Sequence, residues 1–182
     1  SVKKLKNHLK EWAISNEEWQ LSSDDKIYNI SDIDEIKFVD RTFYKERWIK
    51  ENGLEQKLIV TYSIKYRDYQ RTIRNSQVDR AVKTIETNPS KLNKVNPNDY
   101  RRFIEKTSVT SNGEVAEKNH YSIDQEAILK EEAYDGIYAV CTNLEDDATE
   151  IIKVNHRRWE IEECFRIMKS EFKARPVYLT RD

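Results

Sequence analysis

The chain has 182 residues, a formal net charge of −1 and 36% charged residues. Its 4 Trp, 10 Tyr and 5 Phe are enough large apolar side chains to fill a core, which excludes a wholly disordered chain. The near-zero net charge excludes a global positive field, so any DNA-binding face must be local. No apolar run approaches the ~20 residues of a membrane span. The two cysteines, Cys141 and Cys164, are too few for a disulfide framework. We therefore expect a cytoplasmic protein and, because the sequence begins without Met, a piece of a longer one.

The first half of the chain changes between helical and strand-like patterns. Apolar residues at helical spacing predict an amphipathic helix over residues 2–14. Runs rich in β-branched and aromatic residues predict strands over 26–30, 35–43 and, most clearly, 57–65. A helical period then predicts a helix over 66–86, which Asn88-Pro89-Ser90 ends.

The second half mixes short elements of both kinds. We expect a polar loop over 90–98, a short helix over 99–106 and a turn at Ser111-Asn112-Gly113 between two short strands. A helix over 124–132 begins with Asp124 as its N-cap. The continuous apolar run at 136–142 predicts a buried strand, and 175–179 looks extended. Strands and helices follow one another without a βαβ rhythm, so the predicted fold class is α+β.

A polar cluster stands out in the helix predicted over residues 146–172. With about 100° per residue and Arg158 set at zero, Glu162 lies near 40°, Lys169 near 20°, Asn155 near 60° and Arg166 near 80°. Four apolar residues lie at about 280–340° on the same scale: Ile161, Phe165, Met168 and Phe172. We therefore expect the polar residues at the margin of a buried stripe. The angle selects Glu162 among the three glutamates Glu160, Glu162 and Glu163.

Two interpretations of this cluster remain open on the residues alone. Arg158 and Glu162 form an ordinary i,i+4 pair, which contributes only ~0.2–0.5 kcal/mol. Alternatively, a carboxylate between two cations is suited to metal-dependent phosphodiester chemistry.

The wider stretch resembles insertion-sequence DDE transposases that carry a Tyr-x2-Arg-x3-Glu-x6-Lys signature. Arg158, Glu162 and Lys169 match three of its four positions, whereas Asn155 stands where the family has Tyr. Residues 134–143 resemble the family's strand ending in Thr-Asn, residues 158–162 its Arg-Trp-x-Ile-Glu core, and residues 173–178 the run that follows. The resemblance covers about a quarter of the chain.

This resemblance implies an RNase H-like core in which two aspartates and a glutamate hold two divalent ions, Mg²⁺ or Mn²⁺. Glu162 would be the catalytic glutamate and the third acidic metal ligand. Arg158 and Lys169 would hold DNA phosphates, because Arg grips a phosphate bidentately and Lys acts as a mobile charge. Asn155 and Arg166, on the same side of the helix, complete the candidate DNA-binding set.

The two aspartates of the triad have no clear match in the chain. Asp40 is followed by Arg41-Thr42, and Asp135 starts its strand instead of ending one, so we interpret both as turn or strand-edge carboxylates. We therefore expect residues 1–130 to be an α+β subdomain inserted between the second aspartate and the glutamate. Residues 131–182 would be the C-terminal part of the catalytic core, and this chain would be inactive alone.

Other features allow a bland and a functional interpretation. The basic residues of the 66–86 helix either follow a phosphate backbone or form a solvated face. Trp12, Trp19 and Trp48 either stack on bases or belong to the core. The implied partners are transposon-end DNA and, in the full-length protein, a second copy, with no membrane contact. The alternative is a non-catalytic α+β interaction or DNA-binding module.

Overall fold

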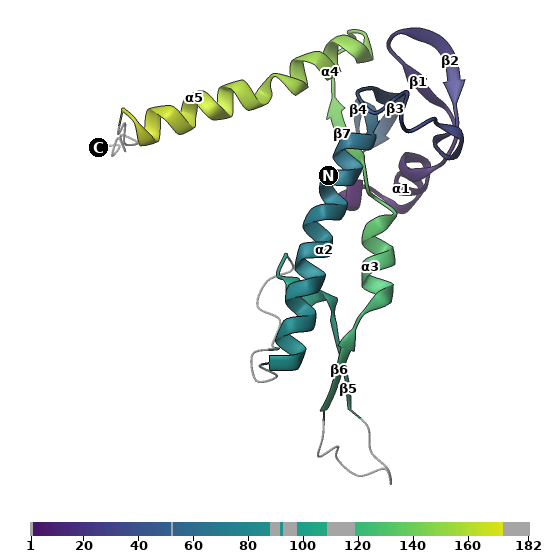
Figure 1. The fold of residues 1–182 in the computed structure, drawn as a ribbon. Coiled ribbons are helices and arrows are strands. Elements are labelled where there is room, and N and C mark those ends of the chain that lie inside the picture. The colour runs from purple at the N-terminus through teal and green to yellow at the C-terminus, as the bar shows by residue number, and fades with distance from the viewer. Residues whose placement is uncertain (1, 52, 88–91, 93–97, 109–118, 173–182) are drawn as a thin grey trace. The chain divides into compact units, whose positions relative to one another are not determined.

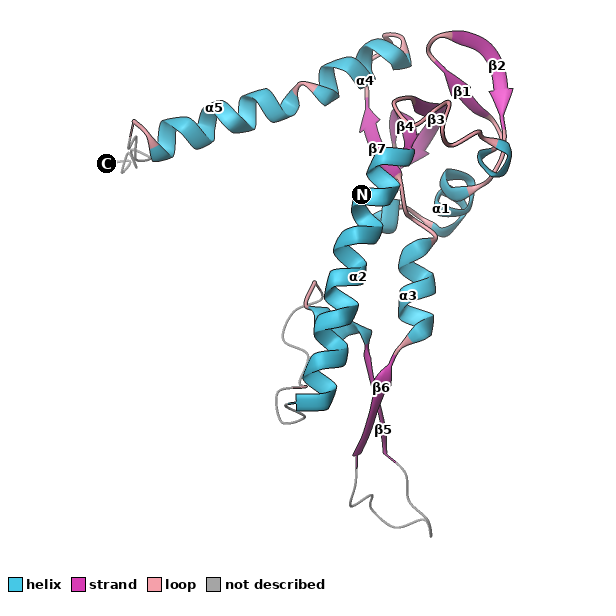
Figure 2. Cartoon of the chain, in the orientation of Figure 1, coloured by secondary structure: helices cyan, strands magenta, loops and turns pink. Residues whose placement is uncertain are grey.

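A computed structural model describes residues 2–51, 53–87, 92, 98–108 and 119–172 (Figure 1). The chain forms two compact units, the first made of Ser1–Arg47 and Leu58–Cys141, the second of Trp48–Lys57 and Thr142–Asp182. Helices and strands are mixed, and the strands form one five-stranded and one two-stranded sheet (Figure 2). The predicted α+β class is therefore confirmed. The functional boundary near residue 130 stays a prediction.

The elements follow one another in an irregular order, with short 3₁₀ helices labelled η. They are η1 (Val2–Lys4), α1 (Asn7–Ile14), β1 (Trp19–Leu21), β2 (Asp24–Tyr28), η2 (Ile30–Asp32), β3 (Thr42–Glu51), β4 (Leu54–Ser63), α2 (Ile64–Thr87), η4 (Tyr100–Phe103), β5 (Ile104–Ser108), β6 (Asn119–Ile123), α3 (Gln125–Glu132), β7 (Ile137–Thr142), α4 (Ala148–His156) and α5 (Arg158–Ser170).

The larger sheet has the strand order β2-β1-β3-β4-β7. β1 pairs antiparallel with both β2 and β3. The run Leu58-Ile59-Val60 of β4 is fully buried, because β4 lies between two other strands and carries apolar side chains on both faces. Trp19 of β1 and Phe43 of β3 are also fully buried, so the core of the first unit lies against this part of the sheet.

The expectation of a buried strand at 136–142 is wrong in its burial. β7 forms over Ile137–Thr142, but it is the last strand of the sheet, and its residues alternate between partial burial and exposure. Its start is fixed beside β4, where Ser63 N–H donates to the Gly136 carbonyl oxygen over 3.0 Å. An apolar run predicts a strand but does not reveal whether a second neighbour covers its outer edge.

The strand predicted over 35–43 is also wrong. Residues 35–40 form turns, because the Asp34 carboxylate accepts hydrogen bonds from the backbone N–H groups of Ile36 and Lys37, each over 3.1 Å. The strand instead starts at Thr42 and continues to Glu51. The hydrogen bonds of one short aspartate side chain thus stabilise a turn in a segment whose residue types favour a strand.

Several helical predictions are confirmed. α2 spans Ile64–Thr87, and α3 begins after Asp124, whose Oδ1 accepts from Ala127 N–H over 2.8 Å. The two helices lie side by side, and the antiparallel β5–β6 pair adjoins them (Figure 1). The predicted helix over 2–14 is split into η1 and α1, and that over 99–106 is one 3₁₀ turn followed by β5. The predicted turn at 111–113, most of the loop at 90–98 and the extended segment at 175–179 lie outside the described residues.

In the second unit, the single helix predicted over 146–172 is two helices. Arg157 ends α4 and precedes α5 with φ −77° and ψ −4°, and its N–H is shared between the carbonyl oxygens of Lys153 and Val154, each at 3.2 Å. This 3₁₀-like step separates Asn155 from the other candidate residues. Lys57 Nζ donates to the Asp146 carbonyl oxygen over 2.8 Å and so holds the segment before α4 against the start of β4.

Candidate functional site

The residues of the sequence signature lie in an open position on α5. The Glu162 side chain is 71% exposed, and Arg158 Nε lies 3.7 Å from its Oε1. This distance is long for a hydrogen bond, and both groups are surrounded by water, so the pair holds the carboxylate weakly. Glu162 is therefore accessible to a ligand or to another chain.

The other candidate residues differ in how far they are engaged. Arg166 pairs with Glu163 through two guanidinium nitrogens, one of them Nε at 2.8 Å. Hydrogen bonding to Arg166 lowers the pKa of Glu163, and the same contact raises the pKa of Arg166. Within the described ranges, the side chains of Lys169 and Asn155 have no recorded hydrogen bond or ion pair. Lys169 is thus an available cation, whereas Arg166 must first leave Glu163 to contact a phosphate.

The predicted burial of the neighbouring apolar stripe is wrong. Ile161, Phe165, Met168 and Phe172 are 59%, 56%, 47% and 75% exposed. The helical period correctly placed these side chains on one face, but a period does not show that anything covers that face. Glu162 therefore lies beside an exposed apolar surface and not at the margin of a core.

Acidic groups that would complete a metal site do not gather around Glu162. The described part of the chain contains no group of three or more His, Cys, Asp and Glu side chains that could hold a metal ion. Asp40 pairs with Lys65 on the surface, and Asp135 is buried in an ion pair of its own.

The basic residues of α2 are largely neutralised by nearby carboxylates. Arg67 binds both oxygens of Glu35, at 2.5 and 2.8 Å, and its Nε donates to Asp68 over 2.9 Å. Its hydrogen bonds lower the pKa of Glu35. Arg74 is buried and Arg71 lies 3.4 Å from Asp135. This half of α2 is neither a simple solvated face nor an open row of phosphate ligands.

The strongest polar contact in the first unit is the pair Arg74–Asp135. Nη1 and Nη2 of Arg74 donate to the two oxygens of Asp135, each over 2.7 Å, and both side chains are only 5% exposed. Gly136, which follows, has φ +78°, and a Cβ there would lie 2.7 Å from a ring atom of Tyr62. Asp135 lies in the turn before β7, as expected, and it is in addition paired with an arginine 61 residues away.

Trp12, Trp19 and Trp48 pack against lysine side chains of the chain itself. Trp19 is fully buried, and the ammonium of Lys45 lies 4.4 Å from its ring centroid and 5.1 Å from that of Trp12. Lys45 itself is 2% exposed and donates to Ser15 Oγ over 2.7 Å. Burial lowers the pKa of Lys45 to about 8. Trp48 is half exposed, with Lys57 over its ring. No spacing in the sequence indicated this buried lysine.

Both cysteines are free and exposed. None of the described helices is long and apolar enough to cross a membrane. Comparisons with protein-family models, with curated proteins and with solved structures found no significant match to this chain.

Proposed function

We propose that this chain carries the glutamate-bearing part of an insertion-sequence DDE transposase, with an RNase H-like core, acting on transposon-end DNA as a homodimer. The observation that carries the proposal is the open carboxylate of Glu162, with Arg158 one turn before it and Lys169 two turns after it on α5. The spacing of these residues, together with the strand that precedes them, is the basis of the family resemblance.

In this proposal Glu162 supplies one carboxylate to a pair of Mg²⁺ or Mn²⁺ ions, and two aspartates outside this chain supply the others. When bound, such ions activate the attacking oxygen and stabilise the leaving oxygen. In this proposal the chain alone is inactive, because it supplies only one of the three carboxylates.

The remaining residues of α5 have the task of holding the DNA strand near Glu162. Arg158 is 68% exposed and only weakly paired, so it can turn to a phosphate at little cost. Lys169 provides a second charge on the same face. Asn155, on α4, is a candidate hydrogen-bond donor to the phosphate backbone of the DNA. We expect Arg166 to contribute least, because its bidentate contact with Glu163 must open first.

DNA binding tests the phosphate contacts in the chain as it stands. Fluorescence anisotropy of a labelled duplex between 50 and 200 mM salt measures affinity and its salt dependence. Each lost phosphate contact reduces the slope of log K against log salt by about 0.9. We expect this reduction for Arg158→Ala and for Lys169→Ala. The matched control is Lys153→Ala, an equally exposed lysine on α4 that pairs with Glu150. Equal slopes for all three variants would contradict the assignment.

The metal role is tested in the protein that contains the aspartates as well. Glu162→Gln keeps the size and hydrogen bonding of the side chain but removes the charge that binds the ion. We expect DNA binding to persist and Mg²⁺-dependent cleavage to be lost, whereas Glu160→Gln, on another face of α5, keeps cleavage. Cleavage by Glu162→Gln at the wild-type rate refutes the proposal.

The exposed stripe of α5 favours a second candidate, a non-catalytic interaction module. Four large apolar side chains on one helix face are typical of a protein-binding surface. Under this alternative the charge of Glu162 is dispensable and Phe165 is not. If Glu162→Gln keeps the biological activity of the full-length protein and Phe165→Ser loses it, the interaction module is supported over the transposase.

A further inference from the structure

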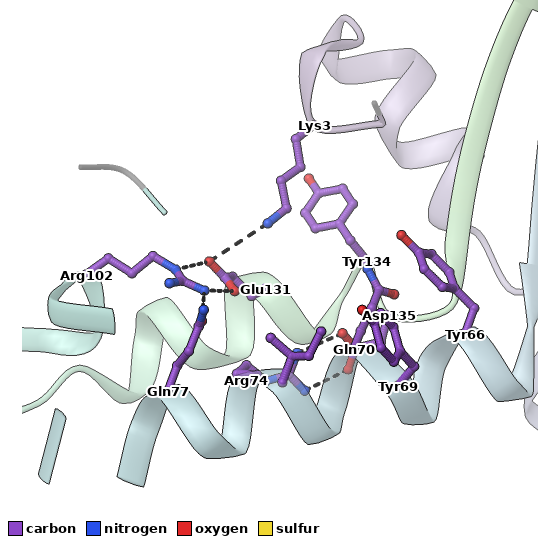
Figure 3. A pocket seen from close by; sticks show the side chains of 11 residues that line it. Lys3, Tyr66, Tyr69, Gln70, Arg74, Gln77, Arg102, Glu131, Tyr134 and Asp135 are labelled. Atoms are coloured by element: carbon purple, nitrogen blue, oxygen red, sulfur yellow. Dashed lines mark hydrogen bonds and ion pairs between the residues drawn. The ribbon is translucent and has the colours of Figure 1, made fainter. Parts of the chain in front are cut away.

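A cavity of about 270 Å³ lies in the first unit, away from the candidate residues of α5 in sequence. α2 forms one side, and the end of α3 with the turn after it forms another. Lys3 from η1 and Arg102 from η4 close the remaining sides (Figure 3). The whole lining belongs to one compact unit.

The carboxylates of the cavity are already engaged. Asp135 accepts from Arg74 over two bonds of 2.7 Å. Glu131 accepts from Arg102 Nε over 2.7 Å and from its Nη2 over 3.1 Å. The cavity therefore offers no free carboxylate to a cationic ligand.

The two glutamines of the cavity also use their acceptor oxygens. Gln70 Oε1 accepts from Gly136 N–H over 2.7 Å, and Gln77 Oε1 accepts from Arg102 Nη2 over 2.7 Å. Since each amide oxygen is occupied, what each side chain still offers is its NH₂ group. In the part of the chain that the structure describes, neither NH₂ group has a recorded acceptor.

A third donor lies deeper in the wall. Arg74 is 4% exposed, and its Nε is buried with no hydrogen-bond partner among the described residues. Buried N–H groups in proteins are nearly always paired, so the Arg74 Nε–H group is a donor still open to an acceptor. Lys3 Nζ, 3.9 Å from Glu131, adds a weakly held positive charge. The unused polar groups of the cavity are thus mostly donors.

An aromatic wall lies beside these donors. The rings of Tyr66 and Tyr69 are stacked, with centroids 6.4 Å apart and planes inclined by 20°. Tyr69 is 61% exposed, so one face of its ring is open to another flat group. Figure 3 shows both rings next to Tyr134 and Asp135 at one end of the cavity.

From these contacts we propose that the cavity binds a small molecule that joins a planar ring to an anionic, acceptor-rich group, as a nucleoside monophosphate does. The ring stacks on Tyr69 and accepts at its edge from the NH₂ group of Gln70, the next residue of α2. The anion accepts from Lys3 and from the NH₂ group of Gln77, two helical turns further along α2. The volume lies just below the range of about 300–1,000 Å³ for ligand cavities, which limits the ligand to about one nucleotide. The site is independent of the role proposed for Glu162.

Isothermal titration calorimetry of the chain tests the two halves of the ligand separately. The probes are deoxyadenosine 5′-monophosphate, deoxyadenosine and inorganic phosphate. We expect saturable one-to-one binding of the monophosphate, with the other two probes at least tenfold weaker. A 5′-phosphorylated oligonucleotide serves as a fourth probe. Tighter binding of the oligonucleotide assigns the site to a strand end, and equal binding assigns it to a free nucleotide. Absence of monophosphate binding, or equal binding of phosphate alone, overturns the proposal.

Variants locate the binding in this cavity. Stacking of a base on an aromatic side chain predicts that Tyr69→Ala weakens monophosphate binding at least fivefold. Lys3→Ala should weaken binding of the monophosphate and leave that of deoxyadenosine unchanged. Lys130→Ala, an exposed residue of α3 outside the cavity, is the control. Tyr69 and Lys3 are exposed, so their variants should fold, which circular dichroism checks. Unchanged affinity in both variants refutes the location.

Discussion

Breaking the buried pair Arg74–Asp135 should be among the most destabilising single changes in this chain. Arg74→Met keeps most of the apolar stem of the side chain and removes both 2.7 Å hydrogen bonds to Asp135. The carboxylate is only 5% exposed, and its remaining cationic neighbour, Arg71, is 3.4 Å away. Leaving a buried charge without its partner costs about 3–5 kcal/mol. Small domains have a total stability of about 5–15 kcal/mol, so the loss is a large part of it.

A double-mutant cycle separates the pair from the rest of the site. Asp135→Asn removes the other charge, and Arg74→Met with Asp135→Asn removes both. Because the double variant leaves no unpaired buried charge, its cost should fall short of the sum of the single costs by about 2–3 kcal/mol. Urea unfolding followed by far-UV circular dichroism and by tryptophan fluorescence gives the free energies, with agreement of the two signals as a check for two-state unfolding.

An exposed ion pair on the surface of α3 provides the control. Lys130 and Glu126 on α3 are 71% and 77% exposed, so Lys130→Ala should leave the free energy of unfolding almost unchanged. The reasoning is refuted if Arg74→Met costs less than about 1 kcal/mol, or if the costs of the two single changes add without coupling.

Three further predictions use matched pairs of variants. In chemical denaturation, Gly136→Ala should lower the free energy of unfolding clearly more than Gly53→Ala. Both glycines have positive φ, but a Cβ at Gly136 would lie 2.7 and 2.9 Å from neighbouring atoms, whereas a Cβ at Gly53 would have no atom within 4 Å. Equal losses in the two variants would contradict this packing. Phe103→Ala should lower the free energy of unfolding by about 3–5 kcal/mol, because Phe103 is fully buried. Phe165 is 56% exposed, so Phe165→Ala should lower the free energy of unfolding far less, and thermal unfolding compares the two variants. The pKa of Lys45, about 8, lies below the ordinary value of 10.5, so the unfolded chain holds this proton more tightly. The free energy of unfolding should then rise between about pH 8 and 10, and pH-dependent unfolding should show that Lys45→Met lacks this rise.

The elements that the sequence predicted well are those specified by their own residues. β4 contains the run Leu58-Ile59-Val60-Thr61-Tyr62, which is rich in β-branched and aromatic residues, α2 has neither Gly nor Pro along its 24 residues, and α3 carries its N-cap at Asp124. In each case the side chains and backbone of neighbouring residues decide the conformation. The failure at residues 35–40 is also local, because one side chain, Asp34, ends the extended conformation by binding two backbone N–H groups.

Environment was harder to predict than conformation. The sequence placed Glu162, Arg158 and Lys169 on one face of a helix, and α5 has that face. It did not show that the apolar stripe beside them is exposed, since a helical period describes only the helix itself. Arg74 and Asp135 have no common pattern in the sequence, because their contact depends on how α2 and α3 pack. The cavity between these helices was unpredictable for the same reason.

The short contact between Ser63 and Gly136 makes one segment of this chain exchangeable. Residues 64–135 leave the large sheet at the end of β4 and return to it at β7, which neighbours β4, and a 3.0 Å hydrogen bond from Ser63 N–H to the Gly136 carbonyl oxygen joins the two points. Segments whose ends lie close together at a surface tolerate insertion and replacement, because the chain that remains need not stretch or bend to close the gap. A short turn at this junction, or an unrelated domain of similar end spacing, can therefore take the place of more than seventy residues, provided that it fills the space of Ile64, which is 2% exposed. The same geometry gives evolution, and a protein engineer, a point at which α2 and α3, which form two sides of the cavity, can be exchanged together, whereas Lys3 stays with the rest of the chain.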